Sequence, residues 1–103
     1  MNLKISGHQI SVTPAIRDYI IQKFAKIQRH YSHDIDAYVV IEVNKLISKI
    51  ELTTHLPKKD LHLEVEHSDM YAAIDLIADK LDRQVIRYKE IHNESVHSGK
   101  SLV

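Results

Sequence analysis

The chain has no cysteine and no tryptophan, only two glycines and two prolines, and no long hydrophobic run. Without cysteine there can be no disulfide, no thiolate metal site and no thiol nucleophile. Two glycines are too few for a glycine-rich loop that cradles phosphates. Apolar runs such as Tyr38 to Ile41 have the length of a strand, whereas a membrane span needs about 20 apolar residues. No apolar signal segment is recognisable, so we expect a cytosolic protein with no membrane contact and no metal or other cofactor.

The formal net charge is zero, which by itself argues against a polyanionic partner. The charges are unevenly distributed, however. The stretch from Pro14 to Tyr31 has Asp18 as its single acid, and its basic residues are Arg17, Lys23, Lys26 and Arg29. The stretch from Ser32 to Ser68 is mildly acidic. The position of the charges is therefore more informative than their sum.

At 103 residues the chain is long enough for one compact domain. Alternating apolar and polar residues predict four strands. The first is Asn2 to Ser6, and Gly7 is expected to end it. The other three lie at about 38–43, 49–54 and 61–66, with the turn-rich Leu56 to Asp60 before the last. Their short links indicate a meander.

Apolar residues at spacings of three and four predict two helices. Thr13 is expected to cap the first, with Pro14 at its first position. Its apolar stripe is Ile16, Ile20, Phe24, Ile27 and Tyr31. Ser68 is expected to cap the second, with Asp69 in its first turn. The second stripe is Met70, Ile74, Ile77, Leu81, Val85 and Tyr88.

The order strand, helix, three strands, helix predicts an α+β fold, with one four-stranded sheet and both helices on its apolar face. A right-handed first crossover makes the first two strands parallel, and the two helices then run roughly parallel to each other. The opposite sheet face, with Glu51, Glu64 and Glu66, should meet water. The apolar pattern fades after Lys89, so we expect a domain of residues 1–90 and a mobile tail of residues 91–103.

Basic residues gather on one flank of each predicted helix, at about 100° per residue. On the first helix this flank holds Tyr19, Lys23, Lys26 and His30, with Arg29 further towards solvent. On the second helix the corresponding flank holds Leu76, Lys80, Arg83 and Arg87, and the other holds Asp75, Asp79 and Asp82. Because the helices should be parallel, one basic row must line the groove between them. This groove and its outer lip could bind RNA phosphates, although both rows could also be ordinary solvated flanks.

Other residue sets give weaker indications. His30 and His33 lack a third ligand, so no metal site is expected. His67 and Asp69 are residue types of an acyl-transfer site, but no oxyanion loop surrounds them, and a small hydrolase stays only as a rival. Tyr71 could stack on a base, whereas Tyr88 belongs to the apolar stripe.

Two groups of residues carry a resemblance to a known family. The more specific runs Asp69-Met70-Tyr71-Ala72-Ala73-Ile74-Asp75 and continues with Lys80-Leu81, Arg83-Gln84 and Tyr88-Lys89. The weaker comprises Gly7, Ile10, Thr13, Ile16, Tyr19 and Lys23-Phe24-x-Lys26. From Met1 to about Glu90 the sequence resembles the short hibernation-promoting factors, a group that includes the ribosome-associated translation inhibitors.

This resemblance implies a β-α-β-β-β-α domain, similar to double-stranded RNA-binding domains. It implies no enzyme activity. The expected partner is the small ribosomal subunit with its ribosomal RNA, at a site between head and body where the domain overlaps the paths of messenger and transfer RNA. Off the ribosome a monomer is expected. The family's ribosomal RNA-binding positions fall on Lys23, Lys26, Arg29, Lys80, Arg83, Arg87 and Lys89.

The chain resembles the short family members, which lack the second domain of the long ones. One short type promotes ribosome dimers with a separate ribosome modulation factor, and another, with a longer and more acidic tail, opposes dimerisation. Here the tail holds only Glu94 as an acid, which favours the promoting type. A protein-interaction module that uses its sheet stays as a rival. The eight histidines, His30 foremost, suggest that ribosome binding tightens as pH falls.

Overall fold

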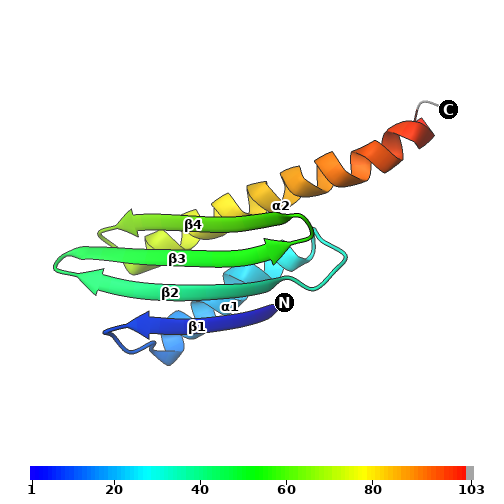
Figure 1. Cartoon of the computed structure of the whole chain (residues 1–103). Coiled ribbons are helices and arrows are strands. Elements are labelled where there is room, and N and C mark those ends of the chain that lie inside the picture. Colours follow the sequence, from blue (N-terminus) through cyan, green and yellow to red (C-terminus); the bar gives the residue numbers. More distant parts are fainter. Residues whose placement is uncertain (102–103) are drawn as a thin grey trace.

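The computed structural model describes the backbone of residues 1–101 and the side chains of residues 1–91. Figure 1 shows two layers, a four-stranded sheet and two helices that both lie on one of its faces. The elements in chain order are β1 (Asn2–His8), α1 (Pro14–Gln28), β2 (Asp36–Asn44), β3 (Ile47–Leu56), β4 (Lys59–His67) and α2 (Met70–Ser101). The α+β fold and the order β-α-β-β-β-α predicted from the sequence are confirmed.

The strands lie in the order β1-β2-β3-β4, with β1 parallel to β2 and the other pairs antiparallel. The parallel pair follows from the helical crossover through α1. The hairpins are tighter than predicted, because only two residues separate the strands, and Lys45 and Lys58 have φ angles of 58° and 63°. Positive φ at the first loop residue, as at Lys45, suits the twist of two-residue hairpins, whereas Lys58 is the second loop residue, after Pro57. β1 continues through Gly7 to His8, so the predicted end at Gly7 is wrong.

The core forms where the apolar strand residues meet the helix stripes. Phe24 of α1, Leu52 of β3 and Leu81 of α2 are each completely buried. Tyr88 is also buried, as its place on the stripe predicted. Burial of these apolar surfaces holds the helix layer on the sheet and so determines which helix flanks are left for binding.

The two helices begin with different caps. At α1 the hydroxyl of Thr13 accepts from the backbone N–H of Ile16 at 3.2 Å, as predicted. At α2 the cap is Asp69, whose carboxylate accepts from the backbone N–H of Tyr71 at 3.1 Å. The prediction that Ser68 caps this helix is wrong because the helix begins one residue later than expected, at Met70.

α2 remains helical to Ser101, although its apolar stripe ends at Tyr88. Figure 1 shows that this last part projects beyond the sheet, where it has no sheet surface to cover. The domain boundary at residue 90 and the mobility of residues 91–103 stay predictions. Residues 102–103 and the side chains from 92 onward lie outside the described structure. In the described part of the chain, neither helix has the length and apolar character needed to cross a membrane.

Candidate nucleic-acid interface

α1 and α2 lie side by side and run in the same direction. Tyr19 contacts Asp75 near the start of both helices, and His30 contacts Asp82 further along. The sequence numbers thus increase together on the two helices, which confirms the predicted parallel arrangement. Between them is an interhelix groove of about 340 Å³, lined by Lys23, Lys26, Ile27, Asp75, Ala78, Asp79 and Asp82.

Asp75 joins the two helices at the start of this groove. Its carboxylate accepts from the Tyr19 hydroxyl at 2.6 Å and lies 3.2 Å from the Lys23 ammonium. The ammonium lies 5.4 Å from the centre of the Tyr19 ring, and Tyr71 packs edge-on against that ring at 5.0 Å. Asp75 therefore positions side chains within the domain, and Tyr71 packs against another tyrosine.

The groove brings the basic row of α1 against the acidic flank of α2. His30 Nδ1 lies 2.7 Å from Asp82, in addition to the Lys23–Asp75 pair. The prediction that one basic row lines the groove is confirmed, but carboxylates face this row. Lys26 differs from Lys23 and His30 in this row. It is exposed, and it forms no ion pair with any of the described residues. The groove is thus a weaker anion site than its lysines suggest.

The contacts around Asp75 shift three pKa values. The hydrogen bond from Tyr19, aided by Lys23, lowers the pKa of Asp75 although burial opposes the shift. The same carboxylate raises the pKa of Tyr19 and of Lys23 through its hydrogen bonds to them. The charged carboxylate and ammonium, together with the neutral phenol, are therefore the favoured forms around neutral pH.

Replacing Asp75 should alter the acid dependence of stability. A carboxylate whose pKa is lowered on folding stabilises the fold above its ordinary value of 3.8, and this contribution disappears as pH falls through the folded-state value. We expect Asp75→Asn to lower Tm slightly at neutral pH and to reduce the loss of Tm between about pH 5 and pH 2. Thermal unfolding across this range, with Asp79→Asn as the matched control, measures the effect; identical acid profiles for Asp75→Asn and the unchanged protein would contradict it.

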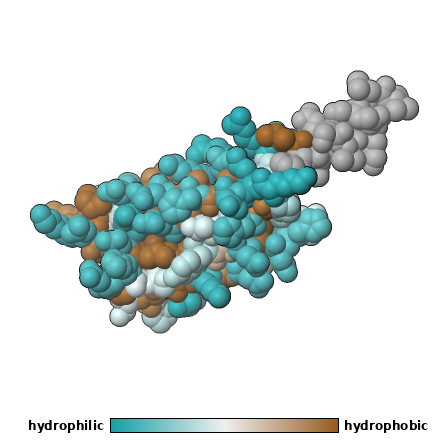
Figure 2. All heavy atoms as spheres, viewed as in Figure 1, coloured by the Kyte–Doolittle hydropathy of each residue, from teal (hydrophilic) through white to brown (hydrophobic). Residues whose placement is uncertain are grey.

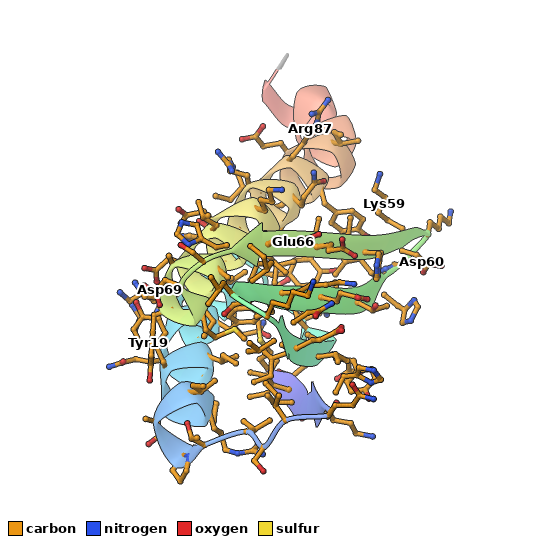
Figure 3. The ribbon with its side chains drawn as sticks, turned by 90° about the vertical axis from the view of Figure 1, so that its left-hand side faces the viewer. Tyr19, Lys59, Asp60, Glu66, Asp69 and Arg87 are labelled. Atoms are coloured by element: carbon orange, nitrogen blue, oxygen red, sulfur yellow. The ribbon has the colours of Figure 1, made fainter. Side chains whose placement is uncertain are left out.

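A second set of cations lies on the flank of α2 that faces away from the groove. We call Leu76, Lys80, Arg83 and Arg87 the outer row. All four side chains are exposed, and Leu76 retains 44% of its surface. Figure 3 shows Arg87 far along α2 from Asp69, which caps this helix, and from Tyr19 of α1. Among the residues whose side chains are described, no acid forms an ion pair with Lys80, Arg83 or Arg87, and all three side chains are exposed.

The last two predicted cations meet at the far end of the groove. Arg29 follows α1 and Lys89 belongs to α2, yet both line one depression with His30, Tyr31 and His33. Sequence reasoning placed Arg29 towards solvent and did not connect it with Lys89. One feature of the sequence could have connected them. Lys89 lies two helical turns after Asp82 and therefore on the flank of α2 that faces α1.

The other sheet face is hydrophilic over most of its surface, as Figure 2 shows. Glu51 and Glu64 lie here, 2.9 and 3.7 Å from the Lys49 ammonium. His62 joins these carboxylates in a group with metal-ligand donor types, but the Lys49 ammonium already forms ion pairs with both carboxylates. The prediction that this face meets water is confirmed.

The residues of the rival hydrolase have structural roles. His67 Nδ1 accepts from the backbone N–H of Asp69 at 3.0 Å, and the Asp69 carboxylate caps α2. An acyl-transfer site needs a nucleophile bonded to a base instead. The geometry therefore favours capping over catalysis.

The fold and these surfaces define the chain as a small α+β binding domain with a cationic row on its second helix. A family model described as "Sigma 54 modulation protein / S30EA ribosomal protein" matches residues 3–93. The chain belongs to this family. The resemblance seen in the sequence is thereby confirmed, and so is the prediction that the chain is not an enzyme, because these are non-enzymatic ribosome-binding factors.

Several relatives and solved structures are similar over most of the chain. The ribosome hibernation promoting factor of Azotobacter vinelandii is 49% identical over 90 residues, which are 87% of this chain and 84% of that protein. Its counterpart from Escherichia coli K12 is 37% identical over 90 residues, which are 95% of that protein. The Protein Y N-terminal domain of Thermus thermophilus superposes with a TM-score of 0.80 at 36% identity, over 85% of this chain and 99% of that one. A ribosomal subunit interface protein of Coxiella burnetii gives 0.76 at 26% identity, over 86% and 98%.

Proposed function

We propose that this protein is a ribosome hibernation factor, which binds ribosomes in the cytoplasm and keeps them idle. The support is family membership together with relatives that are named ribosome hibernation promoting factor and match over nearly their whole length. The proposed action needs no catalytic arrangement, since binding alone can silence translation.

The binding site on the ribosome is, in this proposal, the decoding channel of the small subunit. The outer row supports this site, because Lys80, Arg83 and Arg87 are exposed cations with no acid paired to them in the described part of the chain. Such cations contact RNA phosphates without reading the base sequence. Held there, the rigid domain occludes the paths of messenger and transfer RNA, and no bond is made or broken.

The other predicted positions have different parts in this interface. Lys26, Arg29 and Lys89 are exposed and extend the cationic surface along the groove and around its end. Lys23 shares its ammonium with Asp75, so its contribution to phosphate binding is smaller. We assign it mainly to holding the two helices together.

Ribosome pairing is a further part of the proposal. We infer that the protein promotes dimerisation together with a separate modulation factor, since the segment after residue 90 holds a single acid, Glu94. Sucrose-gradient profiles with and without that factor distinguish this from a protein that blocks dimerisation.

The salt dependence of binding tests the interface. Six exposed cations would displace counterions from phosphates: Lys26, Arg29, Lys80, Arg83, Arg87 and Lys89. We expect affinity for small subunits, measured by co-sedimentation, to fall on the order of 10³-fold between about 50 and 200 mM salt. An affinity that hardly changes over this range would favour the rival, in which the sheet face binds a protein.

A further inference from the structure

The depression that Arg29 and Lys89 share is a second site, distinct from the outer row. It has a volume of about 420 Å³ and is formed by the loop after α1, the β3–β4 turn and α2. We call it the end pocket. Its volume is in the range of pockets that hold small molecules.

The walls of the end pocket are fixed by hydrogen bonds. The Gln28 amide donates to the backbone carbonyls of Tyr31 and His33 at 3.1 and 2.7 Å, and its oxygen accepts from Ile35 N–H at 2.9 Å. One side chain thus satisfies three backbone groups of the loop. On the other side the Tyr88 hydroxyl donates to the carbonyl of Pro57 at 2.8 Å. A pocket held in this way loses little entropy when a ligand binds.

The end pocket combines cations with aromatic rings. Arg29 and Lys89 are exposed at its rim. The His33 ring is exposed and lies at a steep angle to the Tyr31 ring, with centroids 5.6 Å apart, so an aromatic surface accompanies the two cations. The acid paired with a lining residue is Asp82, and His30 lies 2.7 Å from it. Phosphate binds to guanidinium and ammonium groups, and nucleobases stack on histidine and tyrosine rings.

We propose that the end pocket binds one nucleotide, with its phosphate on Arg29 and Lys89 and its base against His33. The same chemistry comes from two sources, an unstacked nucleotide of ribosomal RNA or a free nucleoside monophosphate. For the RNA source the inference rests on the proposed function and deepens it; for the free nucleotide it stands alone.

The test is a titration of the isotope-labelled full chain with adenosine 5′-monophosphate, followed by NMR. We expect shifts of the backbone amides of residues 29–33 and 88–89 at nucleotide concentrations up to about 10 mM, which detects a Kd of ~1 mM. Inorganic phosphate should shift fewer of these amides, since it has no base to stack. Arg29→Ala with Lys89→Ala should weaken binding about tenfold or more.

The matched control is Lys4→Ala with Arg17→Ala, which removes the same charge from exposed positions outside the pocket. This variant should bind the nucleotide as the unchanged protein does. The proposal is overturned if the nucleotide shifts none of these amides, or if the pocket variant and the control bind it equally. An absence of amide shifts overturns the proposal even if the Arg29 and Lys89 variant loses ribosome affinity. In that case Arg29 and Lys89 would be ordinary surface cations.

Ribosome affinity of the same variants distinguishes the two sources. If Arg29→Ala with Lys89→Ala weakens both nucleotide and ribosome binding, the nucleotide belongs to RNA. If only nucleotide binding is lost, the ligand is a free nucleotide. Failure of the proposed function is seen in a separate experiment, as unaltered ribosome binding when the charges of Lys80 and Arg83 are reversed. That outcome does not affect the nucleotide titration.

Discussion

Lys80→Glu combined with Arg83→Glu is expected to abolish co-sedimentation with the small ribosomal subunit. Both residues belong to the outer row, are exposed, and have no acid paired to them among the described side chains. Each change replaces attraction to phosphate by repulsion and removes a charge-assisted contact worth about 1.5–3 kcal/mol. The combined loss of affinity should therefore be roughly 100-fold or more. Exposed substitutions of this kind change stability by only about 0.5 kcal/mol, so the thermal transition should hardly move.

The control for this experiment is Lys4→Glu with Arg17→Glu. It reverses the same number of charges at exposed positions on β1 and α1, away from the outer row. If both variants lose binding equally, net charge rather than the outer row attracts the ribosome. Unaltered binding of the Lys80 and Arg83 variant would refute the RNA-binding role of this row.

Gly7→Ala is expected to cause the largest loss of stability among these substitutions. A Cβ atom at this position would lie 2.2 Å from the carbonyl oxygen of Ile10 and 3.0 Å from its carbon. The loop folds back over the end of β1, with Gln9 at a φ of 61°, so backbone rather than a flexible side chain must move. We expect a loss of about 1–3 kcal/mol or more, which corresponds to a fall in Tm of roughly 4–8 °C per kcal/mol.

Ser6→Ala is the matched control for this prediction. It lies one position earlier on the same strand, and its hydroxyl lies 3.2 Å from the exposed Tyr38 hydroxyl. We expect it to cost less than about 1 kcal/mol. Chemical denaturation of both variants measures the difference, and equal stabilities would mean that the loop between β1 and α1 relaxes freely.

The helices and strands were predictable because apolar residues recur at different spacings in a helix and in a strand. Each of these helices and strands also has an unbroken apolar face. Alternation at Val39 and Ile41 and the stripe from Ile74 to Val85 identified a strand and a helix that the structure buries. The boundaries were less predictable. Gly7 was interpreted as the end of a strand, yet it lies within β1 and its missing side chain makes room for the Ile10 carbonyl. That reason is a contact between segments, which a local pattern does not contain.

The candidate interface was predictable in part for the same reason. The helical period placed Lys80 and Arg83 on one flank of α2, and the structure leaves both exposed. The helical period could not show that Lys23 would face Asp75 across the groove, because that contact depends on how the two helices are turned towards each other.

By itself, the sequence determined the two layers, the parallel helices and the segregation of charge on each helix, because these follow from local periodicity and from the handedness of one crossover. Only the tertiary structure decided which cations remain unpaired and which are shared with acids. It also brought Arg29, which follows α1, and Lys89 of α2 around one pocket, although the two residues are far apart in the sequence. Electrostatic interactions depend on distance in space, and packing on the sheet determines those distances.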